Sequence, residues 1–535
     1  MILLSFALAM LVTTAALPPL RTHAAKLGLI DAPQESRKVH TQSTPHSGGI
    51  AIVLGVCVAC IVWIPESSGH LALYGCIAII VLLALLDDLR DLGHRAKFVG
   101  QILASGLLLA NYGGFQQIPF VPLDTAPHWL TLLFSFVFIL GVTNAVNLSD
   151  GLDGLAAGNG LLSLIVLALF AGQTGQTAFL VLALAMAGGL VGFLRFNTHP
   201  ASIFMGDTGS QFIGFTAAAI TILIVQSEQT PLGPLIPVLI FGLPILDTLM
   251  VMAIRKWRGR PVFSADRSHL HHQLLAVGLH HYEVVIVLYS LQAICIGIAY
   301  QLRFESDAVA LGAYLLFCVT VLSILALARF NNWKVHKPTD GGNGERRNLI
   351  LRRLSWYQNN TARVIAPVLG STLLCAPLLA DNSTELNRTA VGALAFIAVA
   401  WVMLSNHMIL VTRLVCYLAC PLAIYCVLLG SNPESYIIWL DVAVVALGCL
   451  LILAIRLTRK SQFHLDSQDY LILLIVIVAP LLVPSSVEGT TATRIVVYLA
   501  VLLYAAEFVA TKGNLTRWAL CAVGSASIGL ITLSG

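Results

Sequence analysis

The stretch NAVNLSDGLDGLAAG, residues 144–158, places regularly spaced polar side chains between two apolar runs. Asn144, Asn147, Asp150 and Asp153 recur every three residues, and the stretch contains no Lys or Arg. The glycines among them permit a bend and the close approach of a ligand to the backbone. The alternative is a plain turn, because Asn, Asp and Gly are common turn residues.

A second acidic cluster lies in LLALLDDLRDLGHRAK, where an apolar run ends at Asp87 and Asp88. If the helix continues, Asp91 shares a face with both residues. Carboxylates this close repel one another unless a cation or a proton intervenes, so a divalent metal ion would explain the arrangement. An ordinary solvated helix end remains the alternative.

The segment FMGDTGSQF places Asp207 between Gly206 and Thr208 at the start of another apolar run. An aspartate there can cap a helix, or can hold a metal ion where phosphate meets free backbone N–H groups. Capping alone does not account for acidic clusters in successive connections.

A fourth polar connection, RKWRGRPVFSADRSHLHHQ, is basic and rich in histidine. Its Arg267, His269, His271 and His272 form a hydrogen-bond-donating surface suited to phosphate. Zinc competes as a ligand for three histidines, but the HxHH spacing lacks the partners of common zinc sites. A solvated basic loop is the further alternative.

Acidic groups for Mg²⁺ and basic groups for phosphate together favour phosphoryl transfer, in which a metal ion bridges phosphate oxygens and basic side chains neutralise developing charge. The surrounding apolar runs imply a lipid among the substrates.

The elements that must position these residues are membrane-spanning helices. Of the 535 residues, 58% are hydrophobic and 10% are charged, far from the composition of a soluble domain. Hydropathy predicts an all-α polytopic membrane protein with about 18 transmembrane helices and with both termini outside, on the periplasmic side. In that topology Arg303, Arg388 and Arg494 are the only basic residues on the outer face, so every polar cluster above faces the cytoplasm.

The longest polar segment divides the chain. Residues 331–363, rich in Arg and Lys, are predicted to be a basic cytoplasmic linker between a membrane domain of about 11 helices, residues 1–330, and one of about seven, residues 364–535. The second domain has no motif with evident chemistry. The net charge of +4 is explained by basic cytoplasmic loops beside anionic lipid and does not indicate nucleic acid as a partner.

Five ordered motifs, RKVHTQSTPHSGG, LLDDLRD, NAVNLSDGLDG, FMGDTGS and DRSHLHH, resemble those of the polyprenyl-phosphate N-acetylhexosamine-1-phosphate transferases. This is membrane glycosyltransferase family 4, which includes undecaprenyl-phosphate GlcNAc-1-phosphate transferases and phospho-N-acetylmuramoyl-pentapeptide transferases. The resemblance spans about residues 1–330. DRSHLHH is more similar to the GlcNAc-1-phosphate branch.

The resemblance implies transfer of an N-acetylhexosamine 1-phosphate, most simply GlcNAc-1-phosphate, from a UDP-sugar to undecaprenyl phosphate, with release of UMP. It implies Mg²⁺, with Mn²⁺ as a possible substitute. Asp207 looks like the principal metal ligand, assisted by Asp87 and Asp88, and Asp87 looks like the group that deprotonates or positions the lipid phosphate. These three form the predicted catalytic set.

The resemblance also implies the substrate contacts. Asn144, Asn147, Asp150 and Asp153 would line the nucleotide pocket. Basic residues would meet nucleotide, sugar and phosphate, and Asp247 fits a further family position; the expected basic contacts are Lys38, His40, Arg267, His269, His271 and His272.

This function predicts a multi-pass protein of the bacterial inner membrane, with its active site facing the cytoplasm, that initiates a cell-envelope polysaccharide such as O-antigen lipopolysaccharide or a cell-wall polymer. A homodimer is possible. The seven extra helices depart from the family pattern. Two alternatives remain: a secondary transporter, since Gly-interrupted helices and intramembrane carboxylates also occur there, and an inactive scaffold with the same fold.

Overall fold

A computed structural model describes most of the chain. The described residues are 2–31, 44–64, 70–90, 92–121, 125–226, 232–261, 268–331, 333, 365–374, 408–428, 434–457, 470–472, 474–475, 487–512 and 514–533. Five residues singled out in the sequence lie outside them: Lys38, His40, Asp91, Arg267 and Arg388.

The chain divides into two compact units. Unit 1 comprises Met1–Lys337 with Asp466–Leu474, and unit 2 comprises Pro338–Leu465 with Ile475–Gly535. The division after Lys337 falls inside the basic segment 331–363 that the sequence analysis singled out.

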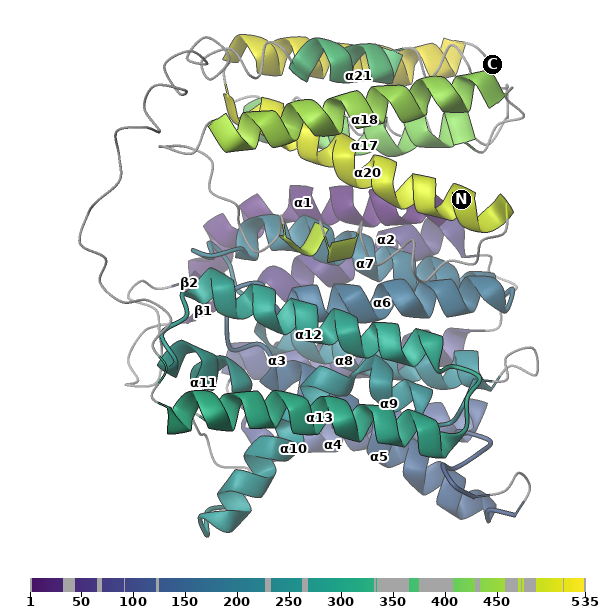
Figure 1. Ribbon diagram of the computed structural model, residues 1–535, viewed down its shortest axis with the longest axis vertical. Helices are drawn as coiled ribbons and strands as arrows, with labels where there is room; N and C mark the ends of the chain where they lie inside the picture. The colour runs from purple at the N-terminus through teal and green to yellow at the C-terminus, as the bar shows by residue number, and fades with distance from the viewer. Residues whose placement is uncertain are drawn as a thin grey trace. The chain divides into compact units, whose positions relative to one another are not determined.

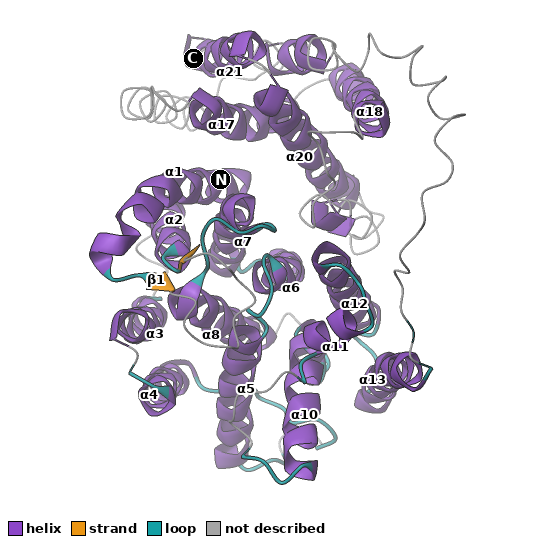
Figure 2. Ribbon diagram, turned by 90° about the vertical axis from the view of Figure 1, so that its left-hand side faces the viewer, coloured by secondary structure: helices purple, strands orange, loops and turns teal. Residues whose placement is uncertain are grey.

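Unit 1 is helical (Figures 1 and 2). Its helices are α1 (Ile2–Leu27), α2 (Gly48–Trp63), α3 (Leu71–Arg90), α4 (His94–Tyr112), α5 (His128–Leu148), α6 (Leu155–Gln173), α7 (Thr177–Asn197), α8 (Gly206–Val225), α9 (Ile236–Ile240), α10 (Gly242–Trp257), α11 (Leu270–Ala276), α12 (His281–Gln301) and α13 (Asp307–Phe330).

The core of unit 1 is built around α8. Every residue from Thr208 to Ile224 is buried, and α8 packs against α2, α3, α5, α6 and α7. Small residues such as Ala217, Ala218 and Ala219 let neighbouring helices approach closely, as is usual in membrane bundles. In Figure 1, α5 and α10 lean away from the other helices in opposite directions, and the two helices pack against each other.

The outer helices carry the lipid-compatible surface. On α3, Leu71, Leu82 and Leu86 are exposed, and on α13 the exposed residues include Leu316 and Val319. An exposed apolar face on a long helix is expected where the solvent is hydrocarbon.

One short strand pair lies between α1 and α2. Strand β1 (Ile30–Asp31) pairs antiparallel with β2 (Thr44–Pro45), with Ile30 opposite Pro45. The next residues bond to the segment that leads into α8: the Gly48 N–H donates to the Phe204 carbonyl (2.9 Å) and the Gly49 N–H to the Met205 carbonyl (2.8 Å). The start of α2 therefore fixes the approach to α8.

Unit 2 is also helical in its described residues. Its longer helices are α17 (Met408–Leu428), α18 (Glu434–Leu457), α20 (Val487–Lys512) and α21 (Asn514–Leu533). Helix α17 packs against α18, α20 and α21.

Eight helices in the described part of the chain are long and apolar enough to cross a membrane: the span Leu4–Leu27 within α1, then α3, α5, α6, α7, α8, α12 and α13. Shorter apolar helices include Gly48–Trp63 and Val411–Ile424. The protein is thus a multi-pass helical membrane protein. The expected count of about 18 spans and the expected orientation of the termini stay predictions.

Candidate active site

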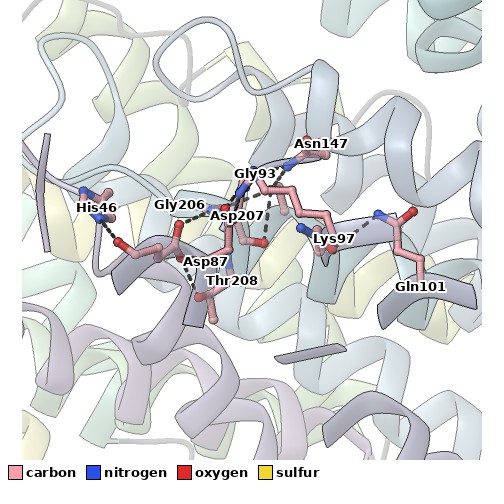
Figure 3. A network of polar contacts seen from close by, with 12 residues as sticks. His46, Asp87, Gly93, Lys97, Gln101, Asn147, Gly206, Asp207 and Thr208 are labelled. Atoms are coloured by element: carbon pink, nitrogen blue, oxygen red, sulfur yellow. Dashed lines mark hydrogen bonds and ion pairs between the residues drawn. The ribbon is translucent and has the colours of Figure 1, made fainter. Parts of the chain in front are cut away.

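The N-terminus of α8 is held by a side chain from another helix. Asp88, near the end of α3, accepts hydrogen bonds from the backbone N–H groups of Asp207 and Thr208, both at 2.9 Å, and from the Thr208 hydroxyl at 2.6 Å (Figure 3). A carboxylate satisfies free N–H groups at a helix start and is favoured by the helix dipole. Asp88 therefore does the capping that the sequence offered as one role of Asp207.

Asp207 faces Asp87 across a lysine from a third helix. The Lys97 ammonium, in the first turn of α4, lies 2.8 Å from Asp87 Oδ2 and also contacts Asp207 Oδ2 (Figure 3). Asp87 is further fixed by the Gly93 N–H at 3.2 Å. Two carboxylates of separate helices thus converge on one positive charge.

Asn147, at the end of α5, completes this group. Its Nδ2 donates to Asp207 Oδ1 at 2.9 Å and to the Ser210 hydroxyl at 2.8 Å. The ends of α3 and α5 and the starts of α4 and α8 consequently meet at one place, and each supplies a polar group.

A layer of three amide side chains lies one helical turn deeper. Gln101 and Asn144 bond reciprocally: Asn144 Nδ2 donates to Gln101 Oε1 at 2.8 Å, and Gln101 Nε2 lies 3.4 Å from Asn144 Oδ1. Gln101 Nε2 also lies 3.3 Å from Gln211 Oε1. We define Gln101, Asn144 and Gln211 as the amide layer. It places Asn144 behind the site rather than at its surface.

The two aspartates of SDGLDG have different surroundings. Asp153 is only 3% exposed, and its Oδ2 accepts from His199 Nδ1 at 2.7 Å and from the Ala201 N–H at 3.1 Å. It thereby holds the connection between α7 and α8. Asp150 is exposed and is the one that can meet a ligand from solvent.

The pKa of the Asp150 carboxyl group is raised by its surroundings. Desolvation by surrounding protein raises its pKa to about 7, together with repulsion from the carboxylates of Asp207, Asp153 and Asp88. Since the side chain reaches solvent, we attribute the larger role to the repulsion. Near neutral pH this carboxyl group carries only part of its charge, and a nearby cation would complete the ionisation.

The histidine segment is positioned by Asp247 of α10. Asp247 Oδ2 lies 2.7 Å from His269 Nδ1, and Oδ1 accepts from the Leu270 N–H at 2.6 Å, so it caps α11. The His269 and His271 rings stack with centroids 5.6 Å apart. Desolvation, with repulsion from His272, lowers the pKa of His271 to about 3. His271 is therefore a neutral imidazole and adds no positive charge for phosphate.

Two glycines of the SDGLDG loop are required by its geometry. A Cβ on Gly151 would lie 2.5 Å from His271 Cε1, so only glycine lets the loop pass the α11 histidines. Gly154 has φ +83°, in the left-handed region that glycine occupies without strain. The bend expected from the sequence is formed at Gly154.

Two polar groups of the site were missed in the sequence. Lys97 ends the quoted segment LLALLDDLRDLGHRAK but was not singled out there, although it follows the Asp87–Asp88 pair at the start of the next helix. His46, in the motif RKVHTQSTPHSGG, has its Nε2 3.1 Å from the Asp88 backbone carbonyl. A basic residue just past an acidic pair on the same side of the membrane was the available signal for Lys97.

The donor set fits a divalent cation at Asp87 and Asp207. Both already share one ammonium group, and carboxylate oxygens are the ligands that Mg²⁺ prefers. Asp88 fits less well, because both of its oxygens accept hydrogen bonds from α8. Asp87 and Asp207 are the residues that would hold the ion.

The fold and this cluster define a class: a multi-pass helical membrane protein with an acidic, lysine-bridged site at converging helix ends. A model of the family described as glycosyl transferase family 4 matches residues 70–225, which contain Asp87, Lys97, Asn147 and Asp207. This chain belongs to that family.

Three relatives carry specific names. The chain is 35% identical over 292 residues to the probable undecaprenyl-phosphate N-acetylglucosaminyl 1-phosphate transferase of Bacillus subtilis (strain 168), covering 54% of this chain and 81% of that protein. It is 33% identical over 354 residues to the decaprenyl-phosphate N-acetylglucosaminephosphotransferase of Mycobacterium tuberculosis (strain ATCC 25618 / H37Rv), covering 59% and 86%. It is 29% identical over 307 residues to the undecaprenyl-phosphate alpha-N-acetylglucosaminyl 1-phosphate transferase of Yersinia pestis, covering 55% and 84%. Over two fifths of this chain lies outside each match.

Proposed function

We propose that this protein transfers GlcNAc-1-phosphate from UDP-GlcNAc to a polyprenyl phosphate, most simply undecaprenyl phosphate, and releases UMP. The observation that carries the proposal is the convergence of Asp87 and Asp207 on Lys97 at four helix ends. The names of the three relatives support the acceptor lipid and the GlcNAc-1-phosphate group.

The reaction exchanges one phosphorus–oxygen bond for another. An oxygen of the lipid phosphate bonds to the β-phosphorus of UDP-GlcNAc, and the bond from that phosphorus to the oxygen shared with the α-phosphate breaks. That oxygen leaves on UMP with the bonding electron pair. The products are polyprenyl-diphospho-GlcNAc and UMP.

The side chains of the site have distinct tasks in this reaction. Asp87 orients the lipid phosphate and accepts its proton when one is present. Lys97 neutralises negative charge on the transferring phosphate. Asn147 fixes the orientation of Asp207 through its amide bond to Oδ1. Mg²⁺, or Mn²⁺ in its place, would supply Lewis-acid neutralisation of the diphosphate when held by Asp87 and Asp207.

The nucleotide is proposed to lie on the side of Asp150, whose exposed carboxyl borders the same cluster. Lys38, His40 and Arg267 stay proposed contacts to nucleotide or phosphate. His269, His271 and His272 are proposed to meet the sugar and its phosphate, with His271 as a neutral hydrogen-bonding group.

The proposed setting is the inner membrane of a bacterium, with the site on the cytoplasmic face, where nucleotide sugars are made. About 18 spans with both termini outside accord with the distribution of basic residues in the sequence. The lipid-linked product would initiate a cell-envelope polysaccharide, such as O-antigen lipopolysaccharide or a cell-wall polymer. A homodimer is also compatible with this activity.

The test uses the full chain in detergent micelles with undecaprenyl phosphate, UDP-GlcNAc and Mg²⁺. We expect release of UMP that requires the lipid phosphate and stops when EDTA exceeds Mg²⁺. UDP-GalNAc and other UDP-N-acetylhexosamines in the same assay identify the preferred donor. No UMP from any of these donors, with protein that remains monodisperse, would contradict the proposal and favour the scaffold alternative.

A further inference from the structure

We propose that Asp153, His199 and His281 form a second metal site in unit 1, suited to a zinc-like transition-metal ion rather than to Mg²⁺. This site is separate from the Asp87–Asp207 pair, and it does not depend on the transferase activity.

The three residues come from three different connections. Asp153 precedes α6, His199 lies between α7 and α8, and His281 begins α12. One ligand atom from each residue can be chosen so that all lie within 4.8 Å of one another. Among the described residues, this is the group of three whose ligand atoms converge in this way; the HxHH triple that suggested zinc in the sequence is not part of it.

The donor types select the kind of ion. Two imidazole nitrogens and one carboxylate oxygen suit Zn²⁺ and similar ions, whereas Mg²⁺ prefers oxygen ligands alone. Bonds of about 2.1 Å in a tetrahedral site place ligand atoms roughly 3.4 Å apart. The observed limit of 4.8 Å requires only side-chain adjustment to reach that geometry.

The carboxylate of the site is already oriented. Asp153 is 3% exposed, and the Ala201 N–H, at 3.1 Å, fixes its Oδ2. His199 Nδ1 lies 2.7 Å from the same oxygen. A metal ion that bridged this nitrogen and the carboxylate would replace the hydrogen bond between them, and a neutral His199 ring would then carry its proton on Nε2. The pair would open by several tenths of an ångström.

The second histidine lies against the first. The His199 and His281 rings stack with centroids 4.0 Å apart and planes inclined by 18°. The stacked rings can each offer a nitrogen beside the Asp153 carboxylate, and the neutral form of an imidazole is the one that binds metal. The His199 side chain is 45% exposed, which provides an entry path from solvent.

An ion at this site would join the three connections that precede α6, α8 and α12. One of these helices, α8, carries Asp207 of the candidate active site, and the connection before α6 also contains Asp150. The expected role is therefore structural: the metal would stabilise the loops that frame the site.

The test measures metal content in the full chain after the affinity tag has been removed. Protein purified in excess Mg²⁺ is supplied with Zn²⁺, desalted and analysed by inductively coupled plasma mass spectrometry. We expect about one tightly held zinc ion per chain in the wild type. His199→Ala and His281→Ala should each lower zinc retention at least about tenfold. His23→Ala removes an exposed histidine of α1 and should leave it unchanged.

A second measurement guards against misfolded variants. Co²⁺ in place of Zn²⁺ gives ligand-field absorption bands that report nitrogen coordination. Those bands should change in His199→Asn and His281→Asn but not in His23→Ala, at equal melting temperature of the metal-free proteins. The proposed site would be overturned by equal zinc retention in the wild type, His199→Ala, His281→Ala and His23→Ala. It would also be overturned if the wild type retained no zinc. UMP release is assayed separately, so failure of the transferase proposal would leave this result intact.

Discussion

Charged side chains are arranged differently in the two units. In the described part of unit 2, two pairs of opposite charges are matched: Arg413 Nε and Nη2 donate to Glu507 at 2.9 and 2.6 Å, and Arg494 lies 3.3 Å from Asp441. Such pairs satisfy their own partners across α17, α18 and α20. The Arg413–Glu507 pair is largely buried, and a buried pair of this kind holds helices together at modest net gain.

In the described part of unit 1, the carboxylates at the active site outnumber the cations. Lys97 bridges Asp87 and Asp207, while Asp150 experiences repulsion from other carboxylates. Excess negative charge in a partly desolvated place is costly unless a cation joins it. Matched charges therefore indicate contacts that hold helices together. Unmatched charges indicate where a ligand is needed.

The largest effect is expected from removing a carboxylate of the unmatched group. Asp207→Asn should lower UMP release by at least about 100-fold, because charge stabilisation at the transferring phosphate is lost. Glu305→Gln, which changes an exposed carboxylate outside the site, is the matched control. Rates are measured per amount of monodisperse protein. If Asp207→Asn kept more than a tenth of the wild-type rate, the unmatched charges would not be the active site.

Breaking a matched pair should affect stability instead. Arg413→Met leaves Glu507 buried without its counter-ion, and we expect a loss of about 3 kcal/mol in the free energy of unfolding. The double variant Arg413→Met/Glu507→Leu should recover most of that loss. Reversible unfolding in mixed micelles measures both. A decrease in UMP release per folded molecule in the double variant would show that unit 2 acts in catalysis.

The amide layer should have an intermediate effect. Gln101→Leu removes the bonds to Asn144 and Gln211, and so loosens the alignment of α4, α5 and α8 behind Lys97, Asn147 and Asp207. We expect about a tenfold fall in kcat with little change in KM for UDP-GlcNAc. Gln301→Leu, at an exposed position, is the control. If Gln101→Leu changed only the melting temperature and not kcat, the amide layer would have a structural role and no role in catalysis.

The smallest effect concerns pH. The Asp150 carboxyl, with a pKa of about 7, is charged above that pH and neutral below it, so attraction for Mg²⁺ should weaken several-fold as the pH falls from about 8 to about 6. Asp150→Asn should bind Mg²⁺ less tightly and should lack this part of the pH dependence. Mg²⁺ titrations of UMP release at several pH values test this. If the pH dependence of Mg²⁺ binding were unchanged in Asp150→Asn, a group other than Asp150 would be its cause.

The stability of the metal-free protein should decrease as the pH rises, whereas its attraction for Mg²⁺ should increase. Because the folded-state pKa of Asp150 is raised above the ordinary 3.8, its stabilising contribution is present below pH 3.8 and is lost as the pH rises toward 7. Asp150→Asn removes this loss, so its melting temperature should fall less than that of the wild type over that range.

The sequence was most informative where several polar residues share one short segment. The pair Asp87–Asp88, the segment around Asp150 and the position of Asp207 could be singled out because such residues are costly near a membrane. The helical membrane fold followed from hydropathy alone. The family membership predicted from the five motifs is confirmed by the comparisons.

The division of labour among these aspartates could not be predicted. Asp88 caps α8, Asp153 holds the connection at His199, and Asp247 caps α11, each through contacts between segments far apart in sequence. Likewise, Gln101 and Gln211 lie 110 residues apart; Gln101 stands in no polar motif, and Gln211 stands in FMGDTGSQF without being singled out there. Which residue faces a ligand and which supports a backbone depends on helix packing that no local pattern encodes.

The cap that Asp88 provides has a mechanical consequence. Helix α3 presents leucines to lipid along its length and ends in the carboxylate that is bonded to the first turn of α8. A membrane thinner or thicker than the apolar length of α3 would tilt this helix, and the tilt would displace Asp207 together with its helix start. Bilayer thickness would thereby be transmitted to the position of Asp87 and Asp207 relative to Lys97 of α4 and Asn147 of α5.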